Sequence, residues 1–157
     1  MSGKVPMTQE GFKSLNKELK RLKEIERPKI IREIAEARGH GDLSENAEYD
    51  AAKEKQGFLE KRIRETEDKI AQAMVIDTSD LDSDKVVFGA SVTLKDEEDG
   101  EETTYRIVGA DEADVKEGKI SINSPISRAL IGRHVDDLVE VKIPAGVKVY
   151  QIVRICF

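Results

Sequence analysis

Apolar residues in the first half of the chain recur at the spacing of an α-helix. Thr8 is placed to cap a helix that begins at Gln9. Pro28 lies inside the run, and because proline costs a helix interior about 3 kcal/mol, we expect a kink there. The apolar positions of this first run are Phe12, Leu15, Leu19 and Leu22, followed by Ile30, Ile31, Ile34 and Ala37.

A second helical run follows after a short polar stretch that contains Gly39 and Gly41. Segments 8–38 and 44–74 are both 31 residues long, or about 46 Å as helices. Equal helices around a short turn predict an antiparallel hairpin, and the second helix is expected to begin at Asp42 or Ser44. Counting outward from the turn gives three expected pairs: Leu19 with Ile63, Leu22 with Leu59, and Phe12 with Ile70.

One continuous helix that forms a dimeric coiled coil is the alternative to the hairpin. Such a helix would run through Gly39 and Gly41, and two glycines cost a helix interior about 2 kcal/mol. The glycines therefore favour the hairpin.

The pattern changes after residue 77 from helical spacing to short alternating segments. Residues 78–85 are acidic and rich in turn formers, which indicates a linker. Asp99 and Gly100 predict a hairpin turn, and Ser124 before Pro125 predicts the start of one short helix that ends at Gly132. The expected strands lie within residues 86–95, 103–108, 119–123, 138–143 and 147–155.

These elements predict an α+β protein with two domains. Residues 1–77 form the antiparallel coiled-coil hairpin, whose acidic tip lies at residues 39–46. Residues 86–157 form a small antiparallel β-sheet domain with one short helix. Each domain is expected to fold around its own core.

Composition and charge limit the classes of function that this chain could have. Charged residues make up 37% of the chain and aromatic residues 4%, as is typical of long solvated helices. Residues 1–77 carry 16 basic and 16 acidic side chains, whereas residues 78–157 carry 10 and 16. A free-standing nucleic-acid binder is expected to be basic, so a partner should hold any nucleic acid that this chain contacts. The single cysteine, Cys156, and the lack of a signal-like N-terminus predict a cytoplasmic protein.

Asp42 and Glu45 are the candidate chemical groups of the tip. Their spacing fits a capping box at the start of a helix, and it also fits a site for Mg²⁺, which prefers carboxylate oxygens. Two carboxylates would supply only part of the oxygen ligands that Mg²⁺ needs. A partner would have to supply the other ligands, so an autonomous hydrolase is disfavoured and action on a partner's active centre is favoured.

Other polar side chains surround the pair. Arg38 and Lys53 could offer a small positive surface to a phosphate backbone, or they could be ordinary solvated charges. Asn46 and Tyr49 lie within about one helical turn of the acids, and Tyr49 is expected to pack against the opposite helix near Ile34.

Three segments resemble a known family. They are residues 34–49 (IAEARGHGDLSENAEY), 109–114 (GADEAD) and 120–132 (ISINSPISRALIG). They are similar to the signatures of the bacterial transcript cleavage factors of the Gre family, and the likeness runs over essentially the whole chain. It implies a coiled-coil hairpin followed by a domain similar to the FKBP-type prolyl isomerases, without isomerase activity.

The resemblance also implies a function. Such a protein is not an enzyme by itself but docks on bacterial RNA polymerase and inserts the hairpin tip through the secondary channel. Asp42 and Glu45 would help to hold a second Mg²⁺ there, so that the polymerase cleaves backtracked nascent RNA. Arg38 and Lys53 match positions near the RNA 3′ end, with Gly39, Gly41, Asn46 and Tyr49 supporting the tip. The free protein is expected to be a monomer, and some proteins of this architecture instead block the channel.

Overall fold

The computed structural model describes residues 4–39, 46–77 and 84–157. They form two compact units, Phe12–Gln72 on the one hand and Met1–Gly11 together with Ala73–Phe157 on the other. β1 (Val5–Thr8) and β2 (Ala73–Ile76) pair as parallel strands, so both ends of the hairpin belong to the sheet-containing unit. The domain boundaries expected at residues 77 and 86 stay predictions.

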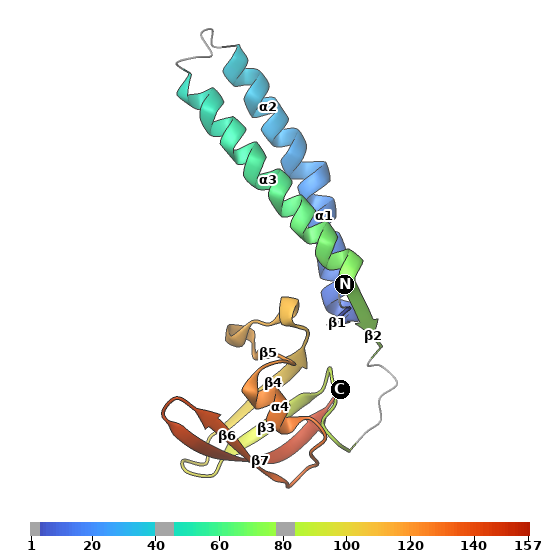
Figure 1. The fold of residues 1–157 in the computed structure, drawn as a ribbon, viewed down its shortest axis with the longest axis vertical. Coiled ribbons are helices and arrows are strands. Elements are labelled where there is room, and N and C mark those ends of the chain that lie inside the picture. Colours follow the sequence, from blue (N-terminus) through green and yellow to red (C-terminus); the bar gives the residue numbers. More distant parts are fainter. Residues whose placement is uncertain (1–3, 40–45, 78–83) are drawn as a thin grey trace. The chain divides into compact units, whose positions relative to one another are not determined.

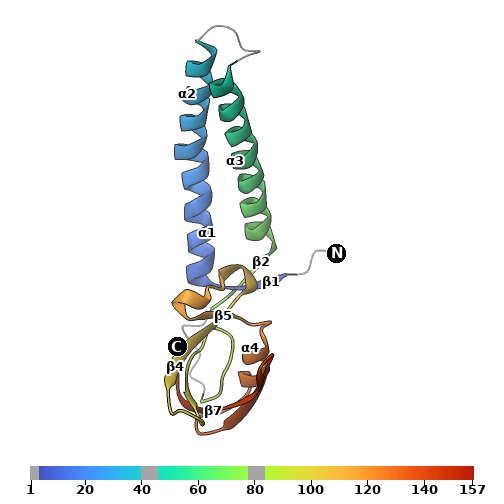
Figure 2. The same cartoon turned by 90° about the vertical axis from the view of Figure 1, so that its left-hand side faces the viewer.

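The hairpin unit contains two long helical arms that lie side by side (Figures 1 and 2). The first arm comprises α1 (Gln9–Arg21), a π-helical segment (Leu22–Glu26) and α2 (Arg27–Arg38). The second arm is α3 (Ala47–Gln72). The antiparallel hairpin predicted from the apolar spacing is confirmed.

A widened turn lies just before Pro28, and the kink expected at the proline stays a prediction. The backbone N–H of Arg27 donates to the carbonyl of Leu22, five residues earlier, which is the hydrogen bond of a π-helix. Pro28 itself lies directly after this widened turn, as the second residue of α2. The chain thus accommodates proline by local widening while the helical arm continues.

The hairpin has a thin apolar core. Leu22 and Ile30 of the first arm pack with Leu59 and Ile63 of α3, and partly buried Leu19 and Ile34 extend the cluster. This confirms that the expected pairs Leu19–Ile63 and Leu22–Leu59 belong to one core, whereas the pair Phe12–Ile70 stays a prediction.

Ile31 does not belong to this core. It is 53% exposed, although the apolar pattern placed it on the seam. Ile30 and Ile34, four residues apart, occupy the face toward α3, and Ile31 is rotated about 100° away from Ile30 at 3.6 residues per turn.

Several ion pairs join the two arms of the hairpin. Arg27 and Glu60 form a bidentate ion pair. Arg27 Nε donates to Glu60 Oε1 at 2.9 Å, and Arg27 Nη2 donates to Glu60 Oε2 at 2.8 Å. The hydrogen bond from Arg27 lowers the pKa of Glu60. Further ion pairs between the arms include Lys23–Glu67, Arg62–Glu18 and Lys55–Glu33.

The sheet of the second unit has the strand order β5-β4-β3-β7-β6. Its neighbouring strands are antiparallel as predicted, apart from β4 and β5, which are parallel. Its elements are β3 (Ser91–Asp96), β4 (Glu102–Val108), β5 (Lys119–Ser121), β6 (Leu138–Ile143) and β7 (Gly146–Cys156), with the helix α4 (Pro125–Leu130) and two 3₁₀ turns, Ala110–Glu112 and Val115–Glu117.

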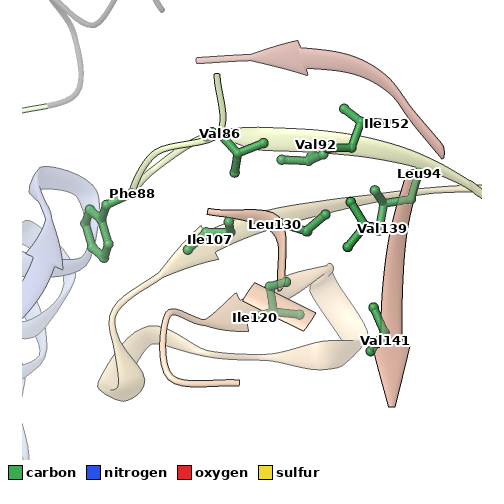
Figure 3. Packing of buried hydrophobic residues seen from close by; sticks show 11 residues of the cluster. Val86, Phe88, Val92, Leu94, Ile107, Ile120, Leu130, Val139, Val141 and Ile152 are labelled. Carbon is green, nitrogen blue, oxygen red and sulfur yellow. The ribbon is translucent and has the colours of Figure 1, made fainter. Parts of the chain in front are cut away.

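The sheet curls around one apolar core (Figure 3). Leu130 of α4 inserts its side chain among residues of the strands and is fully buried. The hydroxyl of Ser124 accepts a hydrogen bond from the backbone N–H of Ser127 at 3.2 Å, which confirms the predicted helix cap. The strand residues of this core include Val92, Leu94, Ile107, Ile120, Val139, Val141 and Ile152.

Asp96 fastens the predicted turn between β3 and β4. Its carboxylate accepts hydrogen bonds from the backbone N–H of Glu98 at 2.8 Å and from Lys148 Nζ at 3.1 Å. These donors, the backbone N–H foremost, hold the pKa of Asp96 below its ordinary value of 3.8. A lowered pKa means that the ionised carboxylate stabilises the fold above pH 3.8, and that this stability is lost as the pH falls through the lowered pKa.

Asp96→Asn should therefore cost stability at neutral pH and little in strong acid. We expect the difference in unfolding free energy between wild type and variant to shrink as the pH falls from about 6 to about 2.5. Urea unfolding at several pH values measures this difference. A difference that stays constant over that range would contradict the assignment to the ionised carboxylate.

No helix in the described ranges is both long enough and apolar enough to cross a membrane.

Candidate functional site

The hairpin tip is the end at which α2 stops and α3 starts. α2 ends at Arg38, and Gly39 caps it by donating its backbone N–H to the carbonyls of Ala35 and Glu36, at 3.2 and 3.1 Å. Gly39 has φ of −68°, so it keeps a right-handed conformation instead of the left-handed one that is common at glycine caps.

Asn46 joins the two helix ends. Its Oδ1 accepts a hydrogen bond from the backbone N–H of Tyr49 at 3.1 Å, as an N-cap does, so α3 begins at Ala47 and not at the expected Asp42 or Ser44. Its Nδ2 donates to the carbonyl of Ala37 in α2, at 2.5 Å. One side chain therefore caps α3 and ties it to the last turn of α2.

Arg38 and Tyr49 form a second link across the tip. The guanidinium carbon of Arg38 lies 5.9 Å from the centre of the Tyr49 ring, within the range of a cation–π contact. Tyr49 therefore pairs with Arg38 of the opposite helix. Lys53 lies one turn further along α3, is exposed, and donates to Gln56 Oε1 at 3.1 Å. The expected sharing of one surface by Arg38 and Lys53 stays a prediction.

The two candidate metal ligands, Asp42 and Glu45, lie outside the described residues, as do His40 and Gly41. Both interpretations of the acid pair, capping box and half of a Mg²⁺ site, thus remain predictions. Within the described ranges there is no group of three or more histidine, cysteine or acidic residues that could hold a metal ion. A pair of carboxylates suits Mg²⁺, which commonly takes one or two carboxylates together with water and phosphate oxygens.

The double role of Asn46 gives a test of how the tip is held. Asn46→Ala removes both the cap and the tie to Ala37, and we expect it to lower hairpin stability by about 1–2 kcal/mol. Asn46→Asp keeps the capping acceptor but has no donor for Ala37, so it should cost less. Urea unfolding followed by circular dichroism at 222 nm measures both effects. Equal stability of Asn46→Ala and wild type would show that neither hydrogen bond matters.

Comparisons with known proteins cover nearly the whole chain. Residues 5–75 match the N-terminal domain of the transcription elongation factors GreA/GreB, and residues 81–156 match their C-terminal domain. GreA of Syntrophotalea carbinolica is 60% identical over 157 residues, which is 100% of this chain and 99% of the relative. GreA of Caulobacter sp. is 60% identical over 152 residues, 97% of each chain. Both of these relatives are GreA proteins.

A solved structure is also similar. The GreA factor homolog 1 protein of Thermus thermophilus is 27% identical, with a TM-score of 0.44 over 98% of this chain and 99% of that one.

Proposed function

The chain belongs to the GreA/GreB family of transcription elongation factors, and on that premise we propose that it stimulates RNA cleavage by bacterial RNA polymerase. It would dock on the polymerase and insert the hairpin tip through the secondary channel. The polymerase would then cut a backtracked nascent RNA, release a short 3′ fragment and resume elongation. The protein acts as a cofactor of the polymerase and not as an enzyme by itself.

The observation that carries this proposal is the way in which the tip is closed. Asn46 and the Arg38–Tyr49 contact hold together the helix ends that flank residues 40–45. Asp42 and Glu45 belong to this six-residue connection between two paired helices. A hairpin of this construction can present two carboxylates on a narrow probe about 46 Å long.

The chemistry follows from the donor set. When bound, the second Mg²⁺ supplies a means to orient or activate water for attack on the phosphodiester. Asp42 and Glu45 would provide two of its oxygen ligands, and the polymerase and the RNA would provide the others. Arg38, next to the connection, would contact phosphate near the RNA 3′ end, and Lys53 could add a second positive charge.

A channel-blocking inhibitor is the second candidate, because the same hairpin could fill the channel without assisting cleavage. The presence of both Asp42 and Glu45 favours the cleavage factor, since a blocking protein has no need for a metal-binding pair.

The deciding experiment uses a backtracked bacterial polymerase complex whose RNA carries a label at the 3′ end. Addition of the protein with Mg²⁺ should release short labelled fragments faster than the polymerase does alone. The protein without polymerase should leave free RNA intact. Blocked nucleotide addition with no fragments would instead identify the inhibitor, and cleavage of free RNA would identify a hydrolase.

A further inference from the structure

We propose that Glu112 is a positioning residue for stimulated cleavage, because its carboxylate anchors the first turn of α1 within the sheet-containing unit. The inference rests on the proposed function. It concerns the root of the hairpin, where the chain enters the helical arm, and not the tip.

Glu112 lies in the 3₁₀ turn Ala110–Glu112 and binds a segment 104 residues earlier in the chain. Its Oε2 accepts hydrogen bonds from the backbone N–H of Thr8 at 3.0 Å and from that of Gly109 at 2.8 Å. Its Oε1 accepts from the hydroxyl of Thr8. One carboxylate therefore holds the last residue of β1 by two donors.

Thr8 connects the Glu112 carboxylate to the first turn of α1. Its hydroxyl oxygen accepts a hydrogen bond from the backbone N–H of Gly11 at 3.1 Å, which is the N-cap contact that the sequence predicts. Thr8 is 1% exposed, so these hydrogen bonds are shielded from water. A continuous chain of hydrogen bonds thus runs from the 3₁₀ turn through Thr8 to the first turn of α1.

Two glycines make room for the carboxylate and the strand. A Cβ atom on Gly11 would lie 2.0 Å from Glu112 Oε1. A Cβ atom on Gly109 would lie 2.1 Å from the carbonyl oxygen of Pro6, in β1. Gly109 has φ of −68°, which any residue can adopt, so space and not backbone conformation calls for glycine there. Both positions are shaped for close contact between this turn and the N-terminal segment.

Neighbouring contacts strengthen the same attachment. Arg106 of β4 forms an ion pair with Glu10, in the first turn of α1, at 3.2 Å. The parallel pairing of β1 with β2 fastens the other end of the hairpin as well, because β2 directly follows α3.

Rigidity at the root matters because the arm is long. A helix about 46 Å long that tilts by about 10° at its base moves its far end by about 8 Å. Misplacement of a catalytic group by about 1 Å can cost a reaction about a hundred-fold. Loss of the Glu112 anchor should therefore reduce cleavage without removing any group from the tip.

The test is Glu112→Gln in the full-length protein, with Asp111→Asn as the matched control. The control makes the same change of charge on the same 3₁₀ turn, but Asp111 takes no part in the hydrogen bonds to Thr8. For Glu112→Gln we expect about ten-fold slower cleavage at saturating protein, with polymerase affinity within about two-fold of wild type. In the free protein, the amide hydrogens of Thr8 and Gly109 should exchange about ten-fold faster. Thr8→Val, which lacks the hydroxyl, should show the same slower cleavage and faster amide exchange. Thr8→Ser, which keeps the hydroxyl, should behave like wild type.

Three results would overturn the proposal. Unchanged amide exchange in Glu112→Gln would show that the carboxylate does not anchor Thr8. Faster exchange with unchanged cleavage would show an anchor that does not position the tip, and loss of polymerase binding would show a general structural role. Absence of cleavage with the wild-type protein overturns the proposed function instead, and the exchange rates then test the anchor separately.

Discussion

Asp42→Asn and Glu45→Gln should each lower stimulated RNA cleavage by about a hundred-fold or more while the fold and polymerase binding are retained. Each substitution keeps the size of the side chain and removes the negative charge that is proposed to attract Mg²⁺. The other metal ligands are proposed to come from polymerase and RNA, so each substitution removes one of the two ligands that this chain is proposed to supply. The release of 3′-labelled fragments from a backtracked complex measures the effect.

Asp50→Asn is the control for the tip variants. Asp50 lies in the first turn of α3, close along the chain to the acid pair, and the substitution makes the same change of charge. It should retain cleavage close to that of wild type. Full cleavage with Asp42→Asn or Glu45→Gln would contradict the proposed role of the pair as Mg²⁺ ligands.

The helical hairpin could be predicted because its signal is periodic and long. Two apolar runs of equal length around Gly39 and Gly41 leave few alternatives, and Thr8 marks the start of α1 as a threonine at an N-cap should. The pattern could not separate Ile30 from Ile31, since adjacent apolar residues fit the same repeat and packing against α3 selects one of them.

The short strands were harder to predict. β1 and β2 have four residues each, and Pro6 interrupts the alternation in β1, so neither shows a strand pattern of its own. They are strands because they pair with each other, although the whole hairpin separates them in the sequence. The parallel pairing of β4 with β5 is likewise a property of the folded sheet, which local sequence does not express.

Some residues of the candidate site could also be predicted from the sequence, and others could not. The acids and glycines of the tip stand out in the sequence because their types and spacing suggest a chemistry. The function of Asn46 as a tie between helices depends on Ala37, nine residues earlier, and that of Glu112 depends on Thr8, 104 residues earlier. Contacts between residues so far apart follow from the fold and not from any local motif.

The second large effect is expected from the hairpin core. Ile63→Ala should lower the free energy of unfolding of the hairpin by about 2–5 kcal/mol, because it leaves a cavity where a fully packed side chain stood. Ile63 is 2% exposed and belongs to a cluster with few other buried members: Leu22, Ile30 and Leu59. Small units have little stability to spare. The variant should therefore also lose stimulated cleavage, since an unfolded arm cannot carry the tip acids.

Ile31→Ala isolates the contribution of burial, because it deletes the same atoms from a side chain that is 53% exposed. We expect it to change the unfolding free energy by no more than about 0.5 kcal/mol. Urea unfolding followed at 222 nm reports mainly on the helices and compares both variants with wild type. Equal effects of the two substitutions would mean that burial against α3 does not stabilise the arms. A midpoint that rises with protein concentration would instead show that the hairpin self-associates, against the expected monomer.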